Sequence, residues 1–95
     1  MLGDDYGPAV PEISRFFGIR IFMYFEDHGA GRFHARYAEW SAVIEIETLA
    51  VSTGDLPGRA LGLVIEWARL HQAELRADWE RARQAQALVP IEPLK

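Results

Sequence analysis

The segment from Phe25 to Tyr37 gathers several side chains that could do acid–base chemistry. It contains Asp27, His28 and His34, together with two arginines and a tyrosine. An imidazole titrates near neutral pH, a phenol can donate a proton, and a guanidinium binds phosphate through parallel hydrogen bonds. Residues of these types on one surface could cleave RNA without a metal ion.

Alternating apolar and polar residues predict that this segment belongs to a β-meander. Strands are expected at residues 19–25, 33–39 and 42–48, with a loop at 26–32 between the first two. A short strand at 49–52 would extend the sheet. The predicted sheet therefore has three to four antiparallel strands.

Beyond this sheet the apolar period becomes helical. Two helices are expected, at about 57–71 and 73–86, and Pro57 suits the first helical position. Trp67 and Trp79 lie on these helices and are expected in the core. The fold class is therefore α+β, a meander followed by two C-terminal helices packed on one sheet face.

The other sheet face is left open and would carry the site. A loop at 26–32 would place Tyr24 opposite His34, and a turn at Trp40 and Ser41 would place Arg36 opposite Glu45. The face would carry the following side chains: Arg20, Phe22, Tyr24, His34, Arg36, Glu45 and Glu47.

Two interpretations of this face remain open. In the first, His34, Tyr24, Arg36 and Arg20 form a catalytic group that cleaves RNA without a metal. In the second, the face is solvated and held by cross-strand ion pairs, foremost Arg36 with Glu45. The glutamates favour the second interpretation, because they would repel a phosphate beside the histidine.

Three further residues are candidates for binding. Asp27 and His28, with His34, offer oxygen and nitrogen ligands, but their spacing matches no recognised metal site. Asp27 and His28 also suit a turn, so neither a metal nor a cofactor is predicted. Trp40 is expected at a turn, where an exposed indole could anchor a partner. The alternative is an indole that folds back over the edge of the sheet.

Composition limits the class of protein. The chain has 95 residues, no cysteine and a net charge of −4, which fits one small cytoplasmic domain and argues against bulk electrostatic binding of nucleic acid. No apolar run approaches the roughly 18 residues of a membrane span. We expect a disordered leader at 1–10, one domain at 11–88 and an extended tail at 89–95.

Many scattered residues resemble one family of small bacterial and archaeal proteins, called domain of unknown function 4160. The resemblance covers about residues 10–95. The matching positions are the run Pro11 to Ile19, Tyr24, Asp27, His28, Phe33, His34, Tyr37, Ile44 to Ile46, Gly54 to Pro57, Arg59, Glu66, Trp67, His71, Glu74, Leu75, Trp79 and Ile91 to Leu94.

The resemblance implies a biological setting rather than an activity. Genes of this family commonly neighbour those of domain of unknown function 2442, and the pairing has prompted a toxin–antitoxin interpretation. We therefore expect a component of a two-gene module that acts through a complex with the neighbouring gene product. The alternative is a non-enzymatic adaptor or regulatory module. A homodimer and an RNA partner are further expectations.

Two positions depart from the family pattern. The family hairpin often reads Pro-Pro-His-Phe-His, whereas Arg32 stands here in place of the first histidine and His34 is retained. Val10 stands where the family usually begins with methionine. Because a GTG codon can start translation, we expect Val10 to be the true start and residues 1–9 to be additional.

Overall fold

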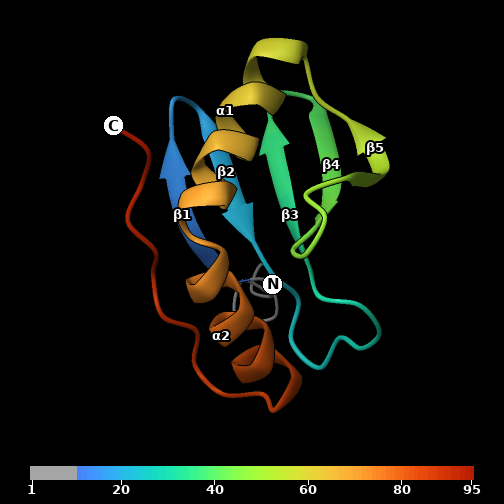
Figure 1. Cartoon of the computed structure of the whole chain (residues 1–95), viewed down its shortest axis with the longest axis vertical. Coiled ribbons are helices and arrows are strands. Elements are labelled where there is room, and N and C mark those ends of the chain that lie inside the picture. The colour runs from blue at the N-terminus through green and yellow to red at the C-terminus, as the bar shows by residue number, and fades with distance from the viewer. Residues whose placement is uncertain (1–10) are drawn as a thin grey trace, which may run out of the picture.

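The structure of the protein, a computed structural model, describes residues 11–95, and the leader predicted at 1–10 lies outside this range. Five strands precede two helices (Figure 1). They are β1 (Glu12–Phe16), β2 (Ile19–Phe22), β3 (Arg32–Tyr37), β4 (Trp40–Glu45), β5 (Val51–Asp55), α1 (Gly58–Leu70) and α2 (Gln72–Arg83).

The strands form one antiparallel meander in the order β1-β2-β3-β4-β5, and the helices lie on one of its faces (Figure 1). The α+β prediction is confirmed, as are the two helices. The predicted number of three to four strands is too low, because the sequence pattern does not predict β1. A tight turn joins β1 to β2 with positive φ angles at Phe17 (50°) and Gly18 (79°). Positive φ at both central residues suits a two-residue hairpin, but a phenylalanine there gives no turn signal.

The predicted register is also wrong. His34 pairs with Phe22 rather than Tyr24, and Arg36 pairs with Ser41 rather than Glu45. The second difference arises because the chain turns at Ala38 and Glu39, where Ala38 has a φ of 53°. Since both shifts are even numbers of residues, each side chain keeps its expected face of the sheet.

The core lies between the sheet and the helices. Trp67 is fully buried on α1, and Phe33 on β3 packs edge-on against it, with ring centroids 5.9 Å apart. Trp79 on α2 is also buried. Both predicted core tryptophans are thereby confirmed. Neither helix within residues 11–95 is long and apolar enough to cross a membrane.

The C-terminal segment, residues 84–95, follows the β1 edge of the sheet (Figure 1). The backbone N–H of Ile91 donates to the carbonyl of Ile13 at 2.8 Å, and the side chain of Ile91 is buried. The indole of Trp67 donates to the carbonyl of Glu92 at 2.8 Å. One edge of the sheet is therefore covered by the chain itself, whereas all five residues of β5 at the other edge are exposed.

Candidate functional site

A hollow of about 100 Å³ lies on the open sheet face. It contains three of the predicted catalytic residues, Tyr24, His34 and Arg36. Its full lining is Phe22, Tyr24, His34, Arg36, Ser41, Ala42, Val43, Thr53 and Gly54. The hollow thus draws side chains from β2 through β5, because adjacent strands of a meander present their alternate residues to the same face.

His34 is held between two aromatic rings. It stacks on Phe22 with ring centroids 5.3 Å apart and planes inclined by 15°. Tyr24 meets it edge-on, with centroids 4.5 Å apart at 81°. Phe22 lies directly opposite His34 in the sheet. Tyr24 lies two residues after Phe22, just beyond the end of β2. The imidazole is therefore positioned by packing rather than by a charged partner.

Burial among these rings controls the charge of His34. Desolvation is the largest effect and lowers the pKa of His34 below its ordinary value of 6.5. The negative charge of Asp27 raises this pKa, and the positive charge of Arg32 lowers it further. Because the net direction is downward, His34 is mainly neutral at pH 7 and can accept a proton.

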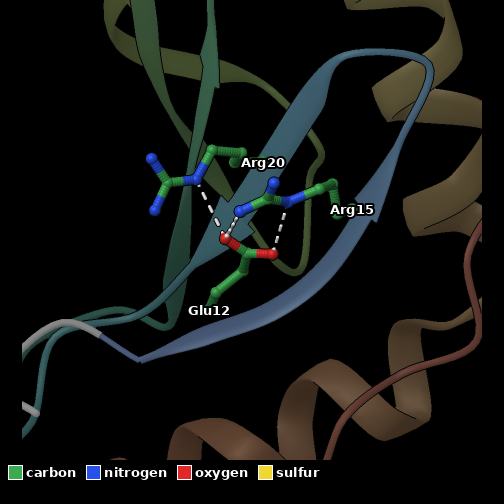
Figure 2. Close-up of polar contacts among 3 residues, drawn as sticks. All are labelled: Glu12, Arg15 and Arg20. Atoms are coloured by element: carbon green, nitrogen blue, oxygen red, sulfur yellow. Dashed lines mark hydrogen bonds and ion pairs between the residues drawn. The ribbon is translucent and has the colours of Figure 1, made fainter. Parts of the chain in front are cut away.

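Arginines form a row beside the hollow. Arg15 lies opposite Arg20 across β1 and β2, and Arg20 lies opposite Arg36 across β2 and β3. Figure 2 shows how one carboxylate serves two of them: Glu12 accepts two hydrogen bonds from Arg15, each 2.8 Å, and one from Arg20 at 2.9 Å. Within residues 11–95, Arg36 makes no ion pair. The row therefore carries an excess of positive charge.

The hydrogen bond from Arg15 is the largest influence on Glu12 and lowers the pKa of that carboxyl, and the same contact raises the pKa of Arg15. Both groups are consequently ionised across the physiological range. Arg20, the fourth predicted catalytic residue, lies beside the hollow through its pairing with Arg36 but is not part of the lining.

Of the two acidic residues expected to repel a phosphate beside His34, Glu47 lies elsewhere and Glu45 stays on the same sheet face as His34. Val43, not a glutamate, pairs with His34. Glu45 lies opposite Arg32, two residues from Val43. Glu47 forms an ion pair with Arg76 of α2, with N–O distances of 2.7 and 3.0 Å. The electrostatic objection to an anion at His34 is weaker in the structure than the sequence suggests.

The loop between β2 and β3 holds the candidates Asp27 and His28. Asp27 accepts hydrogen bonds from Arg32 at 2.6 Å and from the backbone N–H of His28 at 3.0 Å. Arg32 also donates to the carbonyls of His28 and Ala30 at 3.1 and 3.0 Å. The arginine that replaces the family's histidine thus closes this loop. Over residues 11–95, no three histidine or acidic side chains gather as a metal site would require.

Trp40 is 40% exposed at the start of β4. By alternation it shares its face with Ile44, which is fully buried in the core between the sheet and the helices. The indole therefore lies on the opposite face of the sheet from the hollow and does not contribute to it.

Sequence reasoning missed the contribution of β5 to the hollow. Gly54 has a φ of 78°, and a Cβ added there would lie 2.2 Å from the carbonyl oxygen of Ser41. Only glycine allows β5 to approach β4 so closely at this point. The available signal in the sequence was a single glycine within the strand, since an isolated glycine there often marks a close approach of two backbones.

The fold and the hollow define a small α+β domain with one open sheet face. A family model described as domain of unknown function (DUF4160) matches residues 18–80, which is more than half of the chain. The chain belongs to this family, as its sequence predicted. No curated protein and no solved structure matched it.

Proposed function

We propose that this protein is the protein-binding component of a cytoplasmic two-gene, toxin–antitoxin-like module, and that its partner adds a strand to β5. One observation carries the proposal: β5 is an edge strand whose five residues are all exposed, whereas the C-terminal segment occupies the other edge. An uncovered edge presents unpaired N–H and C=O groups that another chain can pair with.

The sequence of β5 favours pairing with another chain. Val51, Ser52 and Thr53 have high or neutral strand propensity, and the strand contains neither the lysine nor the proline that commonly protects an edge. Thr53 and Gly54 line the hollow. A strand added to β5 would therefore run beside the hollow, and Tyr24, 41% exposed, offers an aromatic contact on the same face.

The gene pairing implied by the family resemblance supports a small protein from the neighbouring gene as this partner. A non-enzymatic adaptor would use the same edge and face, so complex formation alone does not separate the two roles. The toxin–antitoxin role adds a second expectation: one of the two genes alone slows growth, and the other relieves that effect.

Co-expression with the neighbouring gene product tests the proposal. We expect purification through a tag on one chain to yield a complex whose mass is the sum of both. Substituting Val51 and Thr53 with lysine should abolish the complex, because lysines on an edge strand oppose strand addition. The matched control is Val89→Lys, which changes an exposed side chain of the C-terminal segment, away from β5. Recovery of the tagged chain without its partner would contradict the proposal.

A second candidate function, metal-independent RNA cleavage, is favoured by the neutral His34 beside the arginine row. We propose that the imidazole removes the proton of a ribose 2′-hydroxyl, whose oxygen then attacks the adjacent phosphorus. The bond from phosphorus to the 5′-oxygen breaks, and the hydroxyl of Tyr24 protonates this leaving group. Arg36 and Arg20 neutralise the phosphate. The imidazolium then returns its proton to the phenolate through solvent.

Single-stranded RNA in the presence of a chelator tests this second candidate. We expect products that end in a 2′,3′-cyclic phosphate and a loss of cleavage in His34→Ala. The control is His28→Ala, which removes an exposed histidine of the neighbouring loop that does not line the hollow. Equal cleavage by both variants, or none by the unaltered protein, would contradict a catalytic His34.

A further inference from the structure

The outer surface of α1 carries an apolar hollow that the proposed function does not use. It has a volume of about 650 Å³ and is floored by Leu61, Ile65 and Leu70. Leu70 is 67% exposed, a larger fraction than that of any other exposed large hydrophobic residue within the described range 11–95. Leu61 and Ile65 are half-buried against the core, and Leu70 is exposed beside them. An accessible apolar surface of this kind is typical of a protein-binding site.

A glycine in the middle of this helix has no explanation inside the chain. Gly62 lowers helix stability relative to alanine, yet a Cβ added there would meet no atom within 4 Å. Packing within the domain therefore does not require the missing side chain. A bare backbone at the centre of an apolar surface permits a second helix to approach closely from outside.

The charges that line this hollow suit a second copy of the same surface. Glu66 and Arg69 both line it, and neither forms an ion pair within residues 11–95. One acidic and one basic residue leave the surface without net charge. In an interface with twofold symmetry, every contact between two different residues occurs twice. Glu66 of each copy would therefore face Arg69 of the other.

We propose that the protein forms a homodimer in which α1 packs antiparallel against α1 of a second copy. Leu61, Ile65 and Leu70 would supply apolar contacts, and Glu66 of each copy would pair with Arg69 of the other. Because the helices cover the sheet face opposite to His34, the dimer leaves both open faces accessible. The dimer is therefore compatible with the proposed function but does not depend on it.

Sedimentation equilibrium of the full chain over micromolar to millimolar concentrations tests the dimer. We expect a mass of two chains at the upper concentrations, and a dissociation constant at least ten-fold higher for Leu70→Ser. Because Leu70 is mostly exposed, this change removes little from the core of one chain. A monomer throughout the range would overturn the proposal.

Charge reversal tests the arrangement. Glu66→Arg and Arg69→Glu should each be monomeric, since each places like charges together twice. An equimolar mixture of these two variants should recover the dimer, because each chain then supplies the charge that the other lacks. Glu80→Arg makes the same charge change on the exposed surface of α2 and should leave the dimer intact. Single reversals that keep the dimer, or a mixture that stays monomeric, would overturn the antiparallel α1 interface.

Discussion

His34 on β3 stacks on Phe22, the residue directly opposite it on β2, with ring centroids 5.3 Å apart and planes inclined by only 15°. A cross-strand pair thus does two things at once. It contributes packing to the open face. It also removes water from one side of the imidazole, which is why the pKa of His34 is lowered.

This lowered pKa predicts how stability changes with pH. Between the folded pKa and the ordinary value of 6.5, the unfolded chain binds a proton at His34 that the folded chain does not. Stability contributed by neutral His34 is therefore fully present above pH 6.5 and decreases as the pH falls. The free energy of unfolding, measured with denaturant, should decrease more between pH 8 and pH 5.5 for the unaltered protein than for His34→Gln.

An NMR titration provides a direct check of the same prediction. The ring protons of His34 should titrate with a midpoint below 6.5, the ordinary value. A midpoint at or above that value would show that Phe22 and Tyr24 do not desolvate the ring. His34→Gln identifies these resonances, because they are absent from its spectrum and those of His28 and His71 remain.

Gly54 should be intolerant of any side chain. The change Gly54→Ala places a Cβ 2.2 Å from the Ser41 carbonyl oxygen at a φ of 78°. We expect a loss of about 1–3 kcal/mol in the free energy of unfolding, measured with denaturant. Gly58→Ala is the matched control, because a Cβ at Gly58 meets nothing within 4 Å. Equal stability of the two variants would contradict the close approach of β5 to β4.

Arg32 should control the order of the loop between β2 and β3. Arg32→Ala removes its hydrogen bonds to Asp27 and to two loop carbonyls. We expect the free energy of unfolding to fall by about 1–2 kcal/mol and proteolysis within residues 26–31 to become faster. Arg83→Ala removes an exposed ion pair with Glu80 and should change stability by less than about 0.5 kcal/mol. Unchanged proteolysis in Arg32→Ala would show that the loop is held by other contacts.

Asp78 should hold the C-terminal segment against the domain. This fully buried carboxylate accepts hydrogen bonds of 2.8 Å from Arg81 and from the backbone N–H of Val89. Asp78→Ala leaves that N–H without its partner. We therefore expect the free energy of unfolding to fall by about 2 kcal/mol. Amide hydrogen exchange at Ile91 should become faster, whereas Glu80→Ala on the same helix should leave it unchanged. An unaltered exchange rate at Ile91 in Asp78→Ala would contradict this role.

The meander and the two helices could be predicted because hydrophobic periodicity is a local property, and the family could be predicted because matching residues occur in order along the chain. It did not predict β1 or the register, because Phe17 and Ala38 adopt positive φ angles that their residue types do not announce. The predicted face nevertheless contained Tyr24, His34 and Arg36, since an even register shift preserves the face.

The remaining parts of the site depend on particular side-chain contacts rather than on hydrophobic periodicity. The ion pair of Glu47 with Arg76 joins residues 29 positions apart, and it removes an expected source of repulsion from the hollow. The loop contacts of Arg32 likewise depend on the conformation of the β2–β3 connection. No local pattern encodes either arrangement.

Amide hydrogen exchange of β5, free and with the partner bound, tests the central claim most directly. If the partner adds a strand to this edge, exchange within Val51–Asp55 should slow strongly in the complex, because edge amides gain hydrogen-bond acceptors. Exchange along α1 should change little on partner binding. Unchanged exchange in β5, with protection confined to another surface, would contradict the proposed mode of binding.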